Sequence, residues 1–213
     1  MKKFKFIDLF SGVGGMRIGF EKASLKHNIL SDCVFSCDLD EKSNEVYFEN
    51  FFIKKHFKDI KKINSEKINH LVPDHDVLLA GFPCQPFSSA GVVKRKYLNR
   101  PHGLSDKKYG NLIFKIIDIL NKKQPKAFLL ENVKYLKKHN KGKTLKKIID
   151  LLRVNYYVPD PKVLNSKHFG LPQSRERVFI IGFKKKYGEF NYPLPSFKKT
   201  KVQDILDKKV DST

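Results

Sequence analysis

Short apolar runs alternate with amphipathic stretches along most of the chain. The runs are continuous, as in parallel strands covered on both faces, and they read FKFIDLF (residues 4–10), CVFSCDLD (33–40), DVLLAG (76–81), KAFLLENV (126–133) and RVFIIGF (177–183). Apolar residues at helical spacing predict helices at 16–24, 41–52, 110–123 and 144–155, and residues 156–166 predict a further strand. This alternation predicts an α/β fold with a doubly wound, Rossmann-like sheet.

The length of 213 residues suits one domain with a full core. We expect that domain to span residues 1–183, because the tail at 184–213 is rich in Lys and Pro and holds no obvious core strand. The span from Gly81 to about Gly110 is polar and too long for an ordinary connection. Segments of this kind in compact domains are usually functional or disordered.

Basic residues dominate the composition, with 43 Lys and Arg against 22 Asp and Glu and a net charge of +21. Such a field attracts polyanions, of which nucleic acid is the commonest. A lysine-rich proteome would produce the same excess, so the charge favours nucleic-acid binding without establishing it. Only six residues are arginine, and Arg175 and Arg177 both lie in QSRERVFIIGF. Arginine kept among so many lysines indicates a need for its planar fork of donors.

Cys33, Cys37 and Cys84 are too few for a disulfide scaffold, which favours a reducing, intracellular setting. We expect Cys33 and Cys37 to be core residues. Asp8 interrupts the N-terminal apolar stretch, which is too short for a signal peptide or a membrane span. The sequence therefore predicts a soluble, cytoplasmic protein, and it shows no metal-ligand spacing.

The segment FSGVGG (Phe10–Gly15) follows the first predicted strand and precedes the first helix. A strand, a glycine turn and a helix open a nucleotide-binding unit, in which small residues let a ligand approach the backbone. Asp38, at the end of the second strand, could accept both hydroxyls of a ribose, and Lys58–Ile60 could supply a polar edge near an adenine. The alternative is an ordinary turn with a solvent-facing acid.

Cys84 lies between two prolines in AGFPCQPFSSAG (80–91), directly after an apolar run. Prolines donate no ladder hydrogen bond, so the strand cannot continue there, whereas a structural cysteine usually lies inside an element. At the carboxyl edge of the sheet the thiol would meet Glu131 and the two arginines of QSRERVFIIGF. Nearby positive charge favours a thiolate, and Glu131 could exchange a proton if burial raised its pKa. The alternatives are a structural cysteine and a glutamate that only forms salt bridges.

Four ordered motifs, FIDLFSGVGGMRIGFE, GFPCQPFSSAG, LLENVKYL and QSRERVFIIGF, resemble those of the DNA (cytosine-5) methyltransferases. The resemblance covers nearly the whole chain and is closest to bacterial restriction-modification members, with a loop similar to that of Dcm-type enzymes. It implies an S-adenosylmethionine-dependent methyltransferase sheet, mostly parallel with an antiparallel strand near the C-terminus. It also implies a cytoplasmic, nucleoid-associated enzyme that acts on a cytosine flipped out of double-stranded DNA, without a metal or a membrane.

The resemblance assigns roles to individual residues. The Cys84 thiolate would add to C6 of the extruded cytosine, Glu131 would contact N3 and the exocyclic amine, and Arg177 would contact O2. Supporting roles at this site fall to Pro83, Asn132 and Arg175. S-adenosylmethionine would lie against Phe10, Gly12, Val13, Gly14, Gly15, Asp38, Leu39, Asp59, Ile60 and Pro83. The loop Ser88–Tyr109 would close over DNA and bind it through Ser88, Lys94, Arg95, Lys96 and Arg100; the alternative is a basic loop without contacts.

The sequence departs from the family pattern after RVFIIGF, where family members continue into a target-recognition domain and two further motifs. A terminal helix of the family would lie beside the first strand, so we expect exposed apolar surface near Phe4, Phe6 or Met16. The chain could be one subunit of a two-polypeptide enzyme, a truncated gene product or a fragment. Tyr109 before Gly110 is a smaller departure from the loop signature.

Three other functions stay open at this point. They are a cytosine-5 methyltransferase of RNA, an inactive remnant or partner-requiring subunit that binds cofactor or nucleic acid, and a nicotinamide dehydrogenase. The last of these explains neither the Cys84 segment nor the arginine pair.

Overall fold

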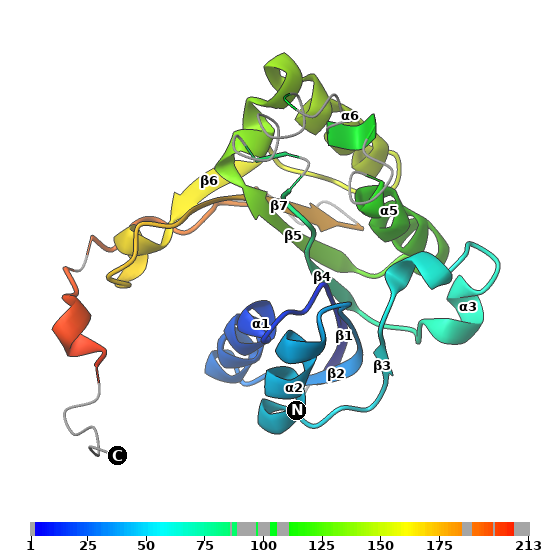
Figure 1. Cartoon of the computed structure of the whole chain (residues 1–213), viewed down its shortest axis with the longest axis horizontal. Helices are drawn as coiled ribbons and strands as arrows, with labels where there is room; N and C mark the ends of the chain where they lie inside the picture. The colour runs from blue at the N-terminus through cyan, green and yellow to red at the C-terminus, as the bar shows by residue number, and fades with distance from the viewer. Residues whose placement is uncertain are drawn as a thin grey trace.

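One seven-stranded sheet, in the order β3-β2-β1-β4-β5-β7-β6, runs through the molecule (Figure 1). The computed structural model describes residues 3–85, 87–88, 97, 103–105, 111–184, 189–197 and 199–206. The strands are β1 (Lys3–Leu9), β2 (Leu30–Cys37), β3 (His56–Phe57), β4 (Val77–Gly81), β5 (Ala127–Val133), β6 (Lys162–Asn165) and β7 (Glu176–Phe183). The first five pair in parallel, and β7 is antiparallel to both of its neighbours, β5 and β6. The predicted sheet, with its antiparallel strand near the C-terminus, is confirmed.

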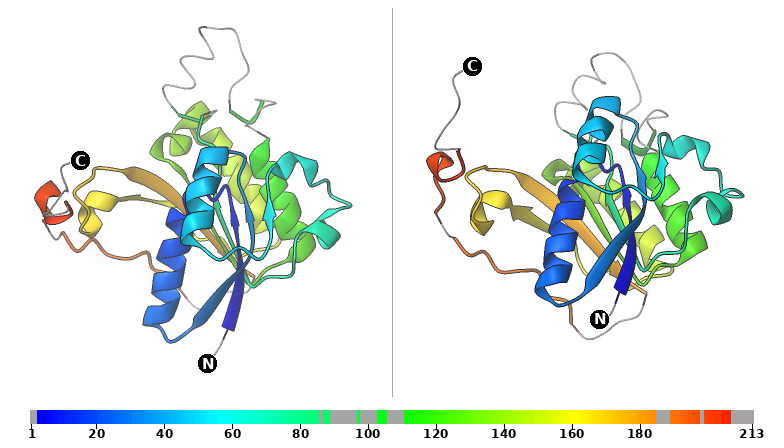
Figure 2. Two further views of the ribbon diagram at one scale, coloured as in Figure 1. Left: turned by 60° about the horizontal axis from the view of Figure 1, so that its bottom comes forward. Right: turned by 90° about the horizontal axis from the view of Figure 1, so that it is seen from below.

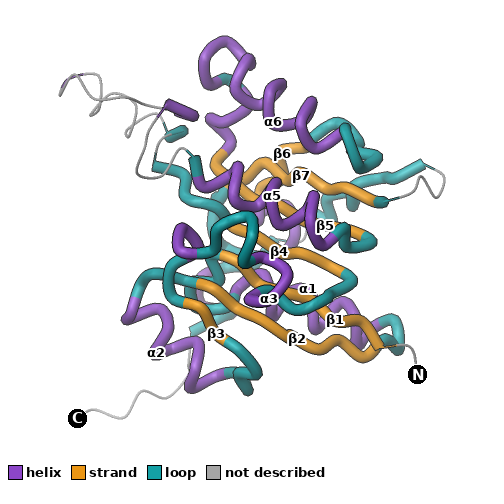
Figure 3. The backbone as a smooth tube through the Cα atoms, turned by 90° about the vertical axis from the view of Figure 1, so that its right-hand side faces the viewer, coloured by secondary structure: helices purple, strands orange, loops and turns teal. Residues whose placement is uncertain are grey.

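Helices cover both faces of the sheet, as Figures 2 and 3 show. They are α1 (Gly15–Lys26), α2 (Glu41–Asn50), α3 (Ile68–Leu71), α5 (Leu112–Lys123) and α6 (Lys143–Arg153). Short 3-10 turns add η1 (Ile60–Lys62), η2 (Gly103–Ser105), η3 (Lys134–Lys137), η4 (His139–Gly142), η5 (Ser166–Phe169) and η6 (Val202–Asp204). Local chemistry sets the bounds: the Asp40 carboxylate accepts the Ser43 N–H (2.8 Å) and caps α2.

The larger core lies on the face of the sheet covered by α5 and α6. Side chains at alternating strand positions, such as Leu78 and Phe128, pack there against the apolar stripes of the two helices, such as Ile116 and Ile148. The opposite face carries a smaller cluster beneath α1, built around Phe6, Cys33 and Leu79. The two clusters make this a sheet covered on both faces, which is why its strands are continuous apolar runs.

Two expectations about this region need correction or refinement. Of the three residues near which apolar surface was expected, Phe6 is fully buried, with its ring centroid 4.9 Å from that of Phe20 on α1, whereas Phe4 and Met16 are half-buried. Residues 156–166 were expected to form one strand, but only Lys162–Asn165 do so, because prolines stand at 159 and 161. Cys33 and Cys37 are core residues, as predicted.

Candidate active site

The carboxyl ends of β4 and β5 bring the predicted thiol and carboxylate to one edge of the sheet. Gly81, the last residue of β4, pairs with Glu131 of β5, and the chain reaches Cys84 three residues later. A Cβ atom placed on Gly81 would lie 3.6 Å from Glu131 Oε2 and 3.9 Å from the Phe10 carbonyl oxygen. The glycine turn after β1 and the carboxylate of β5 therefore meet over Gly81.

A cavity of about 530 Å³ opens at this edge. The residues predicted for the site that line it are ten: Phe10, Asp38, Leu39, Asp59, Ile60, Pro83, Cys84, Glu131, Arg175 and Arg177. Lys58, expected with Asp59 and Ile60 near an adenine, also lines it, and the remaining lining residues are Cys37, Asp40, Lys61, Gly81, Phe82, Gln85, Leu112 and Val133. Nearly all of them neighbour a predicted residue at a strand end, and Leu112 comes from the start of α5.

The turn that carries Cys84 is held from both sides. The Cys84 carbonyl accepts the N–H groups of Phe87 (2.9 Å) and Ser88 (2.8 Å). Before the turn, the buried Asn132 side chain donates to the Phe82 carbonyl (2.9 Å). Cys84 is half-buried and lines the cavity; Cys37 also borders the cavity but is buried, and Cys33 lies in the core. Of the three thiols, that of Cys84 is placed to meet a ligand.

Glu131 and Arg177 form an ion pair on the cavity wall, with 2.7 Å between Glu131 Oε1 and Arg177 Nε. The register places them together, because Arg177 pairs with Val133 across the antiparallel β5–β7 ladder. Burial raises the pKa of Glu131, while the charges of Arg177 and Arg175 act in the opposite direction. The salt bridge that the sequence left as an alternative therefore exists, and it holds a guanidinium beside a carboxyl group that is easier to protonate than usual.

The glycine turn after β1 is fastened to the end of β2. Asp38 Oδ2 accepts the Gly12 N–H (2.7 Å), and Asp38 Oδ1 accepts the Asp40 N–H (2.8 Å). Each carboxylate oxygen keeps a further lone pair for a ligand. Phe10 has a left-handed backbone (φ 55°), which turns the chain at the end of β1 so that it lines the cavity.

The other residues of that turn lie elsewhere. Gly14 (φ 90°) packs against α2, and a Cβ atom there would lie 2.3 Å from the Phe51 ring. Gly12, Val13, Gly14 and Gly15 are not among the residues that line the cavity. Their smallness therefore permits the turn and its packing, while Phe10 and Asp38 are the residues exposed to a ligand.

A buried polar network beneath the turn was not found from the sequence. Tyr47 of α2 donates to Asp8 Oδ2 (3.2 Å) and accepts from Arg17 Nη1 (3.2 Å). Arg17 also pairs with Glu21 (2.8 Å), and its guanidinium lies 4.2 Å from the centroid of the Phe51 ring. Burial raises the pKa of Asp8 from its ordinary value of 3.8 to about 7. The signals were present: an acid inside an apolar run and one of only six arginines.

Most of the expected DNA-binding loop lies outside the described residues, including Lys94, Arg95, Lys96 and Arg100. Ser88, the first of that set, is described and lines a second hollow of about 530 Å³ with Arg177, Lys134 and Lys138. This hollow adjoins the first through Arg177. It extends the basic end of the site along η3.

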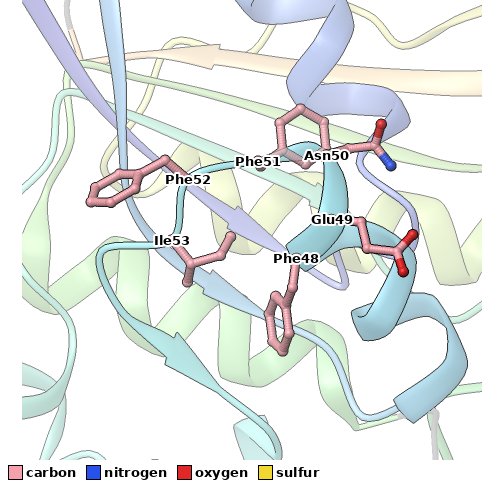
Figure 4. A pocket seen from close by; sticks show the side chains of 6 residues that line it. All are labelled: Phe48, Glu49, Asn50, Phe51, Phe52 and Ile53. Carbon is pink, nitrogen blue, oxygen red and sulfur yellow. The ribbon is translucent and has the colours of Figure 1, made fainter.

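A third hollow lies at the end of α2, where the side chains of Phe48, Phe52 and Ile53 spread over the surface (Figure 4). Glu49 is the one titratable residue among its six lining residues, so it offers no pair of groups for chemistry. Among the residues that the structure describes, no cluster of three His, Cys, Asp or Glu side chains could hold a metal ion. No described helix combines the length and apolarity needed to cross a membrane.

The strand order, the antiparallel β7 and the cavity at the carboxyl edge define a methyltransferase-type α/β domain. Solved structures agree on the fold. A methyltransferase of Entamoeba histolytica, EhMeth, superposes with a TM-score of 0.75 at 24% identity, covering 99% of this chain and 62% of its own. The Dnmt2 methyltransferase of S. pombe superposes with a TM-score of 0.64 at 21% identity, and the match covers 89% of this chain and 52% of that protein. At these identities the likeness extends to the fold alone.

The sequence defines the family. Residues 4–213 match the C-5 cytosine-specific DNA methylases, and the chain belongs to this family. It is 42% identical to the type II methyltransferase M.HpaII of Haemophilus parainfluenzae over 219 residues, covering 100% of this chain and 55% of the relative. It is 46% identical to the type II methyltransferase M.HaeII of Haemophilus aegyptius over 207 residues, and the match covers 97% of this chain and 58% of the relative. The chain thus spans little more than half the length of these relatives.

Proposed function

We propose that the chain is the catalytic part of a DNA (cytosine-5) methyltransferase of a restriction-modification system. It would transfer a methyl group from S-adenosylmethionine to C5 of a cytosine extruded from double-stranded DNA. The observation that carries the proposal is one cavity in which a thiol, a carboxyl–guanidinium pair and an acidic cluster meet. Membership of the family supports the reaction class.

The carboxyl–guanidinium pair fits one edge of a cytosine ring. N3 and O2 are adjacent atoms of the pyrimidine, and Glu131 Oε1 and Arg177 Nε are 2.7 Å apart, so the two groups could hold both atoms at once. Burial favours the protonated form of Glu131, which can hold a proton at N3. Arg177 would donate to O2. Both contacts withdraw electrons from the ring and make C6 electrophilic.

Cys84 is the nucleophile of this mechanism. Its thiolate adds to C6 and forms a carbon–sulfur bond, which leaves C5 electron-rich. The base must leave the duplex first, because C6 cannot be reached within the stack. When bound, S-adenosylmethionine supplies the electrophilic methyl group of its sulfonium. Loss of the C5 proton to a base then restores the C5–C6 double bond and expels Cys84 as a thiolate.

The other end of the cavity fits the cofactor chemically. Three carboxylates gather there, those of Asp38, Asp40 and Asp59, and they suit ribose hydroxyls and the positive charges of the cofactor. Asp38 would hold the ribose through its remaining lone pairs, and Ile60 with Leu39 offers an apolar surface for an adenine. The opposite end, with Arg175 and Arg177, suits an anionic partner. Lys58 and Lys61 line the cavity beside the three carboxylates, so we assign the cofactor to the carboxylate end from its ribose and adenine contacts rather than from charge alone.

The chain covers only part of the length of its relatives. The relatives M.HpaII and M.HaeII are covered over 55% and 58% of their lengths, so a large part of each has no counterpart here. We place target recognition in that part, carried on the same polypeptide or on a second one. The test therefore uses the chain with and without such a part.

The test is covalent trapping on DNA that contains 5-fluorocytosine, in the presence of S-adenosylmethionine. Fluorine blocks loss of the C5 substituent, so an adduct through Cys84 accumulates. Cys84→Ser should abolish the adduct and leave the affinity for S-adenosylhomocysteine, measured by calorimetry, unchanged. Cys33→Ala is the matched control, because Cys33 is buried in the core away from the cavity, and it should form the adduct. An undiminished adduct in Cys84→Ser would refute the assignment.

A further inference from the structure

Phe87 and Gly103, both more than 30 residues before His139 in the sequence, contact its imidazole ring. The Phe87 ring stands edge-on to it, with 5.8 Å between ring centroids. A Cβ atom on Gly103 would lie 2.4 Å from His139 Cε1, and Gly103 has a left-handed backbone (φ 63°). Phe87 and His139 are both buried. Only glycine fits at position 103, so the approach of that segment to His139 is close.

His139 is itself held rigidly. Its Nδ1 shares a hydrogen bond with Thr144 Oγ1 (2.7 Å), at the start of α6, and Thr144 is also buried. Directly after His139, two consecutive non-glycine residues, Asn140 (φ 51°) and Lys141 (φ 53°), adopt the left-handed conformation. Such residues cost on the order of 1–2 kcal/mol each, and strain of this kind tends to persist at functional positions. The chain keeps an unfavourable backbone where it presents this imidazole.

The His139 contact leads directly to the proposed nucleophile. The N–H of Phe87 donates to the Cys84 carbonyl (2.9 Å), so the ring against His139 belongs to the turn that carries the thiol. Asn132 holds the residue two positions before Cys84, through the Phe82 carbonyl (2.9 Å). The two side chains therefore hold the turn on either side of the thiol. Asn132 lies at the end of β5, and His139 lies in η4, which the chain reaches from β5 through η3.

We propose that His139 is a positioning residue that fixes the Cys84 turn, and with it the short turn η2 at Gly103, for attack on the base. This rests on the proposed function, because the reaction is the covalent step described above. Attack on C6 requires the sulfur at a set distance and angle to the ring plane, and misplacement by about 1 Å can cost about 100-fold in rate. His139 does not touch the reacting atoms.

Two variants test the contact from its two sides. His139→Ala removes the imidazole, and Gly103→Ala pushes against it. We expect both to slow adduct formation on 5-fluorocytosine DNA by about 10- to 100-fold, with unchanged affinity for S-adenosylhomocysteine. His139→Asn keeps a polar atom near Thr144 and should recover part of the rate. Matched controls are His75→Gln, a buried histidine ahead of β4, and Gly170→Ala, a glycine with φ 86° at which a Cβ atom would make only an ordinary contact with Thr200 Oγ1 (3.9 Å).

A second readout does not depend on the reaction. A nitroxide label should react with Cys84, since Cys33 and Cys37 are buried, and its spectrum reports the motion of the turn. We expect a more mobile label in His139→Ala and Gly103→Ala than in the controls. If the unaltered chain forms no adduct even when a target-recognition part is supplied, the proposed function fails, while label mobility still decides the positioning role. Wild-type mobility in both folded variants, or equal losses of rate in the controls, would overturn the inference.

Discussion

Replacing Asp8 with asparagine should change how the stability of the protein depends on pH. Asp8 lies on β1 under the glycine turn, is 1% exposed, and receives a hydrogen bond from Tyr47 (3.2 Å). Burial is the largest influence on it and raises its pKa from 3.8 to about 7, while Tyr47 and the charge of Arg17 oppose the rise. The folded protein therefore binds a proton at Asp8 between about pH 4 and 7 that the unfolded chain does not bind.

The sign and size follow from linkage. A raised folded-state pKa contributes stability that is complete below the unfolded value of 3.8 and is lost as pH rises through about 7. Each pH unit in that window is worth about 1.4 kcal/mol, so the loss between pH 5 and pH 8 is about 3 kcal/mol. His75 acts in the opposite sense, because burial lowers its pKa from 6.5 to about 4 and stability falls as pH drops through that window. The total pH profile therefore mixes both groups.

Comparing Asp8→Asn with wild type separates the contribution of Asp8 to the pH dependence of stability from that of His75. Asp8→Asn cannot ionise but can still accept from Tyr47, so its free energy of unfolding should lose about 3 kcal/mol less than wild type between pH 5 and pH 8. Urea unfolding followed by circular dichroism at both pH values measures the difference. Asp150→Asn, on the exposed surface of α6, is the matched control and should follow wild type. Parallel profiles for wild type and Asp8→Asn would refute the assignment of a buried, protonated Asp8.

Three further predictions concern the same regions. His75→Gln should remove the loss of stability between about pH 6.5 and 4 in urea unfolding, and an unchanged acid limb would contradict the buried, neutral histidine. Arg177→Gln removes a charge that lowers the pKa of Glu131, so the carboxyl pKa should rise; infrared titration should show this, and a fall would contradict the ion pair. Gly14→Ala should weaken binding of S-adenosylhomocysteine and lower the melting temperature through the Phe51 clash, whereas Gly19→Ala, in open space on α1, should stabilise by about 1 kcal/mol. Equal melting temperatures for these two glycine variants would show that the turn tolerates a side chain.

The parts of the fold that could be predicted are those with long periodic signals. The five continuous apolar runs became β1, β2, β4, β5 and β7, and α6 buries the stripe that its spacing predicts. Strand β3 (His56–Phe57) has two residues and no pattern of its own, so only pairing with β2 identifies it. The short α3 was missed for the same reason. Its position depends on the core that it joins.

The candidate site divides in a similar way. Cys84, Glu131 and Arg177 could be placed together because strand ends in an α/β sheet share one edge. The polar network around Tyr47 could not be predicted, because its side chains come from β1, α1 and α2 and no local sequence pattern shows that these three elements meet. The glycines of FSGVGG were assigned to the cofactor as a group, yet the structure uses Gly14 for packing against Phe51. Spacing identifies a turn but not which of its residues a ligand reaches.

Gly81 lines the cavity where the glycine turn after β1 and the Glu131 carboxylate come together. Its backbone would accept a methyl group without strain, because the nearest atoms would lie at 3.6 Å, an ordinary van der Waals distance. An added methyl group would nevertheless stand between the Phe10 carbonyl oxygen (3.9 Å) and Glu131 Oε2 (3.6 Å), which belong to the two ends of the proposed site. We expect Gly81→Ala to preserve the fold and the binding of each ligand, while its methyl group separates the cofactor from the base. The cofactor and the cytosine could then both bind without reacting, so a substitution at Gly81 would let binding be measured separately from methyl transfer.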